Sequence, residues 1–246
     1  MEHATYKRIV RGADTAILFI HGIAGTPNHF RPFLPLVPET VSVCNLLLDG
    51  HGGGVRDFSR TSMEKWEAQV KETVCELTEN HKKLYIVAHS MGTLFAIEQA
   101  IQNDRIAGLF LLAVPIKLFI KPRMLRNTTL VYLDKVSPSD PVATAAKECY
   151  GIRTEKNPLR YLGWIPRYLE LFAKIRRTRK LLPLLQTSAV ALQSMRDEMV
   201  ARTSADYLSE HSAMRVIELV HAGHYYYPEA ELKIILAEFQ NFITKE

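Results

Sequence analysis

Cysteine is scarce in this chain. Only three of the 246 residues are cysteine, Cys44, Cys75 and Cys149, and no two of them have the spacing of a metal-binding pair. A disulfide framework and a structural zinc site are therefore not expected, and the sequence predicts neither a metal ion nor a cofactor. The composition is otherwise ordinary, with 47% hydrophobic and 23% charged residues, so the chain can bury a large core without cross-links. We expect Cys44 and Cys75 to be small core residues.

Long hydrophobic runs are also absent. The longest apolar stretch, residues 106–116, is too short to span a bilayer and contains Pro115. The first residues, MEHATYKRIVRG, already carry several charges and lack the pattern of a secretory leader. No internal repeat or low-complexity tract is visible. These absences predict a cytoplasmic protein with one main domain and an elaboration on it.

What the sequence does contain is an alternation of strand and helix patterns. Short, nearly continuous runs of Ile, Val, Leu and Phe are typical of strands covered on both faces of a parallel sheet. Such runs lie at residues 15–20, 41–48, 84–88, 106–114, 188–192 and 216–220. Before the third run, Thr61-Ser62-Met63-Glu64 has the form of a capping box, and apolar residues then recur at helical spacing. Further helix patterns follow Ser90 and close the chain, so the predicted fold class is α/β.

The stretch YIVAHSMGT, residues 85–93, leads from a predicted strand to a predicted helix through a turn that contains Ser90. Small residues, Ala88 and Gly92, stand two places before and after the serine, where strand and helix backbones would pass close together. This pattern is typical of a nucleophile elbow, which holds a serine hydroxyl above the sheet in a strained backbone conformation. The alternative is an ordinary helix N-cap serine, so the motif needs support from elsewhere in the chain.

A second segment that fits this chemistry is HGIAG, residues 21–25, directly after the predicted strand at 15–20. A glycine-containing turn at this point lets a main-chain N–H face the nucleophile. We assign the oxyanion hole to the backbone N–H groups of Ile23 and Met91, and the start of the helix after the serine adds its positive dipole end. His21 and His51 are expected to brace their loops by hydrogen bonding.

A serine hydroxyl becomes a good nucleophile only when a base takes its proton, and an imidazole serves best near neutral pH. Of the nine histidines, His224 is the preferred base, because the loop at residues 222–224 follows the last predicted strand and can reach back to Ser90. His221 is the alternative. It stands three residues earlier and is expected still to belong to the strand.

A carboxylate must hold the imidazole in the correct tautomer. The turn after the predicted strand at 188–192 offers Asp197 as the preferred acid, with Glu198 and Asp206 as alternatives. The order along the chain is then serine, acid, histidine. This order is the one expected of the α/β-hydrolase architecture.

These motifs make the chain resemble the carboxylesterase and monoacylglycerol lipase group of the α/β-hydrolases, from about residue 15 to the C-terminus except for the middle. The segments that carry the resemblance are HGIAGTPNHF, LLLDGHGGG, VAHSMG, LQSMRDEMVA and HAGHYYYPEAE. Ala88 departs from the glycine of the strict elbow pattern, and Thr93 stands where many members have a second glycine. The resemblance implies an α/β-hydrolase fold, a mostly parallel central sheet flanked by helices, with a small helical cap inserted after the sixth strand.

The resemblance also implies a function. It predicts hydrolysis of carboxylic esters through an acyl-enzyme, with Ser90, Asp197 and His224 as the triad and Ile23 and Met91 as the oxyanion donors. An acyl thioesterase or amidase would use the same triad, because these substrates pass through a similar tetrahedral oxyanion. A non-catalytic ligand-binding protein with this fold is the alternative from another class.

The middle of the chain, residues 117–186, is predicted to form the cap, leaving residues 1–116 and 187–246 as the core. Residues 117–180 carry fifteen Lys or Arg against five Asp or Glu, an excess of ten positive charges, whereas the whole chain has an excess of five. Such asymmetry favours contact with an anionic membrane surface or anionic substrates. The alternative is that the basic run at 174–180 is only a solvated helix face.

Aromatic and aliphatic residues alternate with these charges and suit an acyl chain. The residues that we expect to contact substrate are Tyr132, Trp164, Tyr168 and Phe172. The predicted partner is therefore a small-molecule ester with an acyl chain. Nucleic acid is not expected, because no recognised nucleic-acid module accompanies the basic residues. The sequence makes no prediction about the oligomeric state.

Overall fold

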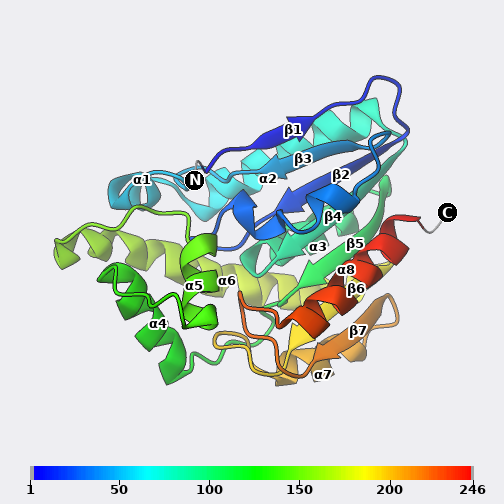
Figure 1. Cartoon of the computed structure of the whole chain (residues 1–246). Coiled ribbons are helices and arrows are strands. Elements are labelled where there is room, and N and C mark those ends of the chain that lie inside the picture. The colour runs from blue at the N-terminus through cyan, green and yellow to red at the C-terminus, as the bar shows by residue number, and fades with distance from the viewer. Residues whose placement is uncertain (1–2, 245–246) are drawn as a thin grey trace.

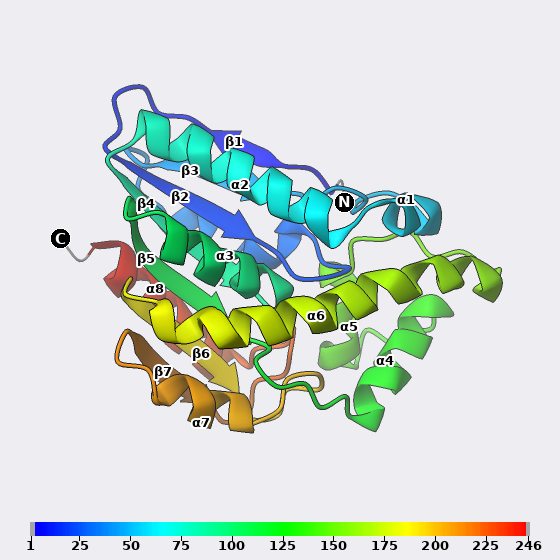
Figure 2. The ribbon, with the colours of Figure 1, turned by 180° about the vertical axis from the view of Figure 1, so that it is seen from behind.

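The computed structural model describes residues 3–244 and contains a seven-stranded sheet with helices on both faces (Figures 1 and 2). The strands are β1 Tyr6–Arg8, β2 Thr15–Ile20, β3 Ser42–Leu46, β4 Lys83–His89, β5 Ile106–Leu112, β6 Ala189–Ser194 and β7 Met214–Leu219. Their order across the sheet is β1-β3-β2-β4-β5-β6-β7, with β1 antiparallel to β3 and the other neighbours parallel. The predicted fold class, with a mostly parallel sheet, is confirmed.

Helices α2, α3, α6 and α7 cover one face of the sheet, and α8 with two short 3₁₀ helices, η1 and η2, covers the other (Figures 1 and 2). The α-helices are α1 Val55–Arg60, α2 Met63–Asn80, α3 Met91–Gln102, α4 Pro122–Tyr132, α5 Pro141–Cys149, α6 Ile165–Leu181, α7 Thr203–Ser209 and α8 Glu229–Thr244. The 3₁₀ helices are η1 Pro27–Phe30, η2 Leu34–Leu36, η3 Pro158–Trp164 and η4 Leu182–Leu184.

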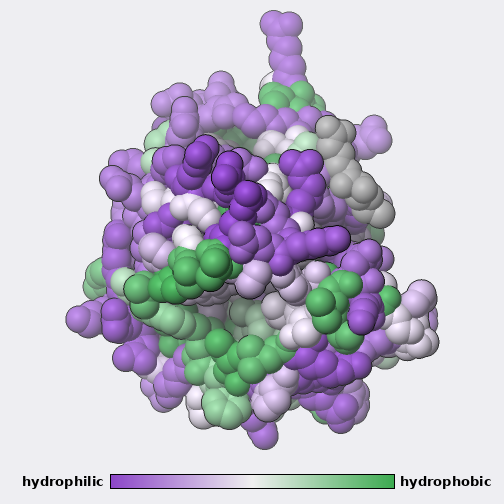
Figure 3. All heavy atoms as spheres, turned by 90° about the vertical axis from the view of Figure 1, so that its left-hand side faces the viewer, coloured by the Kyte–Doolittle hydropathy of each residue, from purple (hydrophilic) through white to green (hydrophobic). Residues whose placement is uncertain are grey.

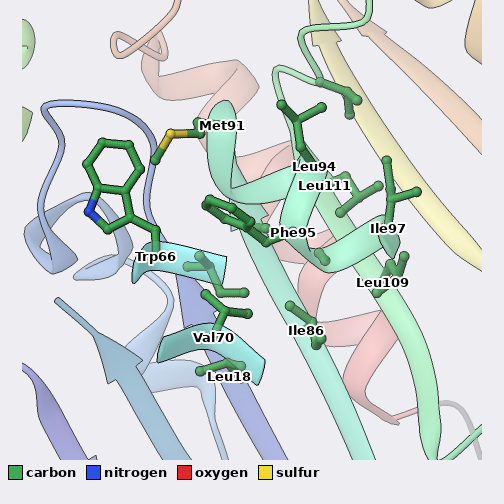
Figure 4. Close-up of a cluster of buried hydrophobic side chains, with 14 of the residues drawn as sticks. Leu18, Trp66, Val70, Ile86, Met91, Leu94, Phe95, Ile97, Leu109 and Leu111 are labelled. Carbon is green, nitrogen blue, oxygen red and sulfur yellow. The ribbon is translucent and has the colours of Figure 1, made fainter. Parts of the chain in front are cut away.

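Alternate residues of each central strand enter different halves of the core. Along β2, Leu18 faces the layer of α2 and α3, whereas Ile17 and Phe19 face the layer of α8. Both sets are buried, which explains why the strands read as continuous apolar runs. Figure 4 shows the first layer, where side chains of α2 and α3 pack on the sheet. Those labelled are Leu18, Trp66, Val70, Ile86, Met91, Leu94, Phe95, Ile97, Leu109 and Leu111.

Helix α2 follows the predicted apolar stripe but begins one residue later than the predicted capping box. Its N-cap is Ser62, whose hydroxyl accepts the N–H of Lys65 at 3.2 Å, while Thr61 ends α1. The expectation for the cysteines is correct for Cys44, which is buried, and wrong for Cys75, which is exposed. Cys75 lies on α2 about 100° around the helix from a buried valine, so it faces away from the sheet.

The chain between β5 and β6 contains α4, α5, η3, α6 and η4. It follows the fifth strand, not the sixth as the resemblance implied, because only one short strand stands before β2 among the described residues. Figure 1 shows α4 and α5 beyond one end of the sheet, whereas α6 runs back along α3. The division at residues 117 and 186 remains a prediction. No helix within residues 3–244 combines the length and apolar character that crossing a bilayer requires.

Candidate active site

Ser90 occupies the turn between β4 and α3 in a strained backbone conformation. Its φ is +52° and its ψ is −124°, values that cost a non-glycine residue of the order of 1–3 kcal/mol. Neighbouring hydrogen bonds hold the turn, since Ser90 N donates to Leu112 O at 2.9 Å and Thr93 Oγ1 donates to Ser90 O at 2.6 Å. The serine therefore stands at the carboxyl end of the sheet in a fixed orientation.

Two positions around this turn must be glycine because a side chain there would collide with neighbouring atoms. A Cβ on Gly92 would lie 2.2 Å from the carbonyl oxygen of Ile20, so the start of α3 passes directly over the end of β2. A Cβ on Gly22 would lie 2.8 Å from Ser90 Cβ. The loop after β2 is thereby brought into contact with the serine.

Asp197 and His224 meet in the interior, only 1% and 2% exposed. Asp197 Oδ2 lies 2.8 Å from His224 Nδ1, and Oδ1 accepts the N–H groups of Met199 and Val200 at 2.7 and 2.8 Å. Because a carboxylate only accepts, Nδ1 of the neutral ring carries the hydrogen and Nε2 is left as an acceptor. His224 Nε2 is buried and has no hydrogen-bond partner among residues 3–244. It is available to take a proton.

The turn that carries Asp197 is supported by the segment that enters α4. Phe119 N donates to Met199 O and Lys121 N donates to Glu198 O, both at 2.9 Å. The carboxylate is thus fixed by its own turn, and that turn is fixed by the neighbouring segment of the same chain that leads into α4.

The serine turn and the histidine loop are joined through His89. Its Nε2 donates to the carbonyl oxygen of His224 at 2.9 Å, and the two rings lie 4.7 Å apart. Burial lowers the pKa of His89 well below 6.5, so this ring is neutral. In the described part of the chain no hydrogen bond joins Ser90 Oγ to His224 Nε2. Such bonds often form only in the substrate complex.

The alternatives named from the sequence are placed differently. His221 is exposed, and its N–H donates to Glu231 Oε1 at 2.8 Å. Asp206 lies exposed on α7, outside the cavities described below. The structure therefore brings Asp197 and His224 together and leaves His221 and Asp206 elsewhere.

Glu198 takes a position that the sequence did not indicate. It is 5% exposed, and its Oε2 accepts the backbone N–H of His224 at 2.8 Å. Its carboxylate also lies against Gly223, where a Cβ would come 2.9 Å from Oε1. Glu198 thus fixes the backbone of the histidine loop. The only sequence feature that pointed to this role is that Glu198 directly follows Asp197 in the same turn.

The two residues whose amides are expected to form the oxyanion hole line one cavity with the serine. Ile23, Ser90 and Met91 border a cavity of about 200 Å³. Met91 is the first residue of α3, so its N–H is among those that a helix leaves without an internal acceptor. Ile23 lies in a tight turn in which Gly25 N donates to the carbonyl oxygen of Gly22 at 3.1 Å.

His21 and His51 form the foundation of this turn. His21 Nδ1 donates to Gly22 O at 2.8 Å, and His21 Nε2 accepts the N–H of Leu48 at 3.1 Å. His51 lies edge-on to His21, with 4.7 Å between ring centroids. Burial lowers the pKa of His51 to about 4 and that of His21 well below 6.5. His51 Nδ1 lies 3.2 Å from the carbonyl oxygens of Leu48 and Asp49. Both rings are therefore neutral and brace their loops by hydrogen bonding, as expected.

A larger cavity, about 400 Å³, adjoins the first and shares Ile23 and Tyr168 with it. His224 borders this larger cavity, together with Tyr132 and Trp164. Figure 3 shows apolar side chains gathered around a hollow on the face that carries α4 and α5. Three of the four predicted substrate contacts therefore line the larger cavity.

The fourth, Phe172, lines the smaller cavity beside Ser90, and Tyr168 borders both. Two residues that were not predicted from the sequence, Tyr150 and Tyr225, also line the larger cavity, and burial raises the pKa of both hydroxyls. Their positions depend on loops without a periodic pattern, so no sequence signal marked them. Within residues 3–244 no cluster of three or more His, Cys, Asp or Glu has the arrangement of a metal site.

Comparisons with known proteins identify the family of the chain. A family model described as "Alpha/beta hydrolase family" matches residues 17–233. One similar protein is a thermostable monoacylglycerol lipase from Bacillus sp. (strain H-257), 30% identical over 94 residues. That aligned stretch is 38% of this chain and 38% of the lipase, so it spans well under half of either protein.

Two solved structures illustrate the likeness in fold. One, described with LipS and LipT, two metagenome-derived lipolytic enzymes, has a TM-score of 0.75 at 18% identity and covers 100% of this chain and 98% of that one. The monoacylglycerol lipase of Paleococcus ferrophilus has a TM-score of 0.67 at 17% identity, over 98% of this chain and 99% of that one. At such identities the likeness shows a shared fold.

Proposed function

Because this chain belongs to the alpha/beta hydrolase family, we propose that it hydrolyses carboxylic esters through a triad of Ser90, His224 and Asp197. The observation that carries the proposal is the state of the imidazole. Asp197 Oδ2 lies 2.8 Å from His224 Nδ1, while the buried Nε2 of His224 has no hydrogen-bond partner among residues 3–244. A base with one nitrogen fixed and the other free, on a loop hydrogen-bonded to the residue before a strained serine, suits nucleophilic catalysis.

The first half of the reaction would form an acyl-enzyme. His224 Nε2 takes the hydroxyl proton as Ser90 Oγ bonds to the ester carbonyl carbon. The carbonyl oxygen becomes an oxyanion, and the N–H groups of Ile23 and Met91 donate to it. The carbon–oxygen bond to the alcohol then breaks, and His224 gives its proton to the departing alcohol.

The second half would release the acid. His224 takes a proton from water as the water oxygen bonds to the acyl carbon. The bond to Ser90 Oγ breaks, and His224 returns the proton to the serine. Asp197, fixed by two backbone N–H groups, keeps the ring oriented and stabilises its charged form.

The histidines that surround this base do not compete with it for protons. His29 lies against His89, with ring centroids 4.0 Å apart, and burial lowers the pKa of His29 to about 3. His89 is also neutral, as shown above. The positive charge that develops during catalysis would therefore reside on His224.

We propose that residues 117–186 form the cap and that its cavities hold the acyl chain and the leaving alcohol. Tyr132, Trp164, Tyr168 and Phe172 would contact the substrate. The mostly apolar walls support an acyl ester. A short-chain carboxylesterase and a monoacylglycerol lipase both fit these walls, and the similar Bacillus protein is named for the second activity.

Exposed residues of the cap support a second proposed partner, an anionic lipid surface. Several apolar side chains of this segment are exposed, and Phe119, Leu125 and Leu169 are 60–62% exposed. Basic residues stand between them in the sequence. Sedimentation with anionic liposomes across a salt series tests this proposal. We expect retention that falls as salt rises, and no retention at low salt would refute it.

Ser90→Ala tests the proposed activity. Hydrolysis of p-nitrophenyl esters of rising acyl length and of monoacylglycerols should fall on the order of 10⁶-fold in the variant. An active-site-directed phosphonate should label the wild-type serine and not the alanine variant. A rate maximum at short acyl groups would indicate a carboxylesterase, and preference for long-chain monoacylglycerols a lipase. Undiminished turnover by Ser90→Ala would refute the proposal.

A further inference from the structure

A short stretch of the segment between β5 and β6 touches the loops that surround Ser90. Gly151 N donates to the carbonyl oxygen of Ala24 at 2.8 Å, and Gly151 O accepts the N–H of Gly52 at 2.6 Å. Gly151 therefore lies between the loop after β2, which contains the proposed oxyanion donor, and the loop after β3. It is hydrogen-bonded to both.

The contact leaves no room for a side chain. A Cβ on Gly151 would lie 2.1 Å from the carbonyl oxygen of Gly25 and 3.2 Å from Thr26 Cβ. Real Cβ atoms do not approach backbone oxygen so closely. The φ of Gly151 is not positive, so glycine is needed here for space and not for its backbone freedom.

The turn on the other side of this contact is strained. Ala24 has a φ of +53°, a value that costs an alanine of the order of 1 kcal/mol and persists only where neighbours hold it. Two bonds close the turn, from Gly25 N to Gly22 O and from Gly151 N to Ala24 O. Gly151 N holds the peptide unit of Ala24 O and Gly25 N–H, and that N–H in turn holds the peptide unit of Gly22 O and Ile23 N–H. The direction of the Ile23 N–H is therefore linked to both bonds.

The stretch around Gly151 is itself anchored on both sides. Ile152 is 4% exposed in the core, and Arg153 N donates to Gly53 O at 2.9 Å. Before it, Cys149 Sγ lies 3.4 Å from His29 Nδ1, and Tyr150 lines the larger cavity. Gly151 is thus held against the turn by buried neighbours and cannot withdraw independently.

We propose that Gly151 is a positioning residue, which holds the turn at residues 22–25 in the shape that directs the Ile23 N–H toward the oxyanion. This inference rests on the proposed function. It means that part of the cap segment belongs to the catalytic apparatus, because the oxyanion turn is completed by a residue about 130 positions away in the chain.

Gly151→Ala tests the proposal. Its methyl group must move the Gly25 carbonyl by roughly 1 Å to reach ordinary contact, which opens the bond to Ala24. Loss of one oxyanion donor lowers kcat about 10²- to 10³-fold, so we expect a fall of about 10²-fold. KM for a p-nitrophenyl ester should stay within about threefold, because acylation and deacylation both use the oxyanion donors and should slow together.

Gly163→Ala is the matched control. Gly163 lies in η3 of the same segment, and its Cβ would meet Ser59 Oγ at 2.7 Å on α1, away from the oxyanion turn. We expect kcat to stay within about twofold of wild type. An equal fall of kcat in both variants would show general disturbance of the segment and overturn the proposal.

The outcomes also separate this inference from the proposed function. If Ser90→Ala is inactive while a folded Gly151→Ala keeps wild-type kcat, only the role of Gly151 is refuted. If Gly151→Ala does not fold, hydrogen exchange on the wild-type protein decides. The Gly151 amide should then exchange slowly and become more protected with a bound boronic acid that mimics the oxyanion. Exchange at the rate of a free amide, or no change on binding, would overturn the proposal.

Discussion

Replacing Asp197 by asparagine should switch His224 to the wrong tautomer without removing the side chain. In the native site Oδ1 accepts two backbone N–H groups, from Met199 and Val200, and Oδ2 accepts His224 Nδ1–H. An asparagine amide has one oxygen, and only that oxygen can satisfy the two backbone donors. Its NH₂ group must therefore face His224 Nδ1, which then has to accept.

The consequence for catalysis follows from the ring. When Nδ1 accepts, the hydrogen moves to Nε2, and Nε2 can no longer take the proton of Ser90. The same change in a serine protease triad lowers kcat about 10⁴-fold, equivalent to about 5 kcal/mol in the activation free energy. The free energy of unfolding should fall by less than about 2 kcal/mol, because both backbone hydrogen bonds remain.

Steady-state hydrolysis of a p-nitrophenyl ester at pH 7.5, beside urea unfolding of the same preparations, measures both effects. Asp206→Asn is the control, since Asp206 is an exposed acid on α7. We expect the control to keep the wild-type kcat and KM. A folded Asp197→Asn variant that loses less than tenfold in kcat would refute the assignment of the acid.

Two further predictions concern stability. Burial keeps the pKa of His29 at about 3 and of His51 at about 4, so below pH 6.5 the unfolded chain binds protons that the folded chain does not. The free energy of unfolding should therefore fall as pH drops from 6.5 toward 4, by about 1.4 kcal/mol per pH unit for each such histidine. Equal urea midpoints at pH 7.5 and pH 5 would contradict this. Lys174→Met should cost on the order of 1–3 kcal/mol, because buried Glu98 loses its nearest cation and keeps only the half-exposed Arg177 at 3.1 Å, and adding Glu98→Gln should restore most of the loss in urea unfolding.

Most of the sheet could be predicted because its strands are buried on both faces. The run at 15–20 coincides with β2, and the other five predicted runs overlap β3 to β7. The strand that escaped prediction is β1, whose three residues, Tyr6–Arg8, are mostly exposed and polar. A short edge strand buries too little apolar surface to leave a periodic pattern.

The site was predictable where local sequence determines it. The elbow at Ser90 and the loops of Asp197 and His224 follow strands, so their place at one end of the sheet follows from strand direction. The bond from Glu198 to His224 could not be foreseen in the same way. It joins segments 26 residues apart through folded loops that carry no periodic signal.

The basic run at 174–180 shows the same limit. Arg176 and Arg179 are exposed, as a solvated helix face requires, but Lys174 is only 4% exposed. Its ammonium lies 2.7 Å from Glu67 Oε1 and 2.8 Å from Glu98 Oε2. The sequence shows how many basic residues the run contains, but not which of them is buried in an ion pair with another helix.

That ion cluster restricts how new hydrolases could be built from this one. Lys174 and Arg177 belong to α6, and each pairs with Glu67 of α2 and Glu98 of α3, so the two positive and two negative charges balance only across the junction. A chimera that transplanted residues 117–186 into a relative without these carboxylates would place a bare ammonium in its interior. The donor segment and its two acidic acceptors must therefore be exchanged as one unit.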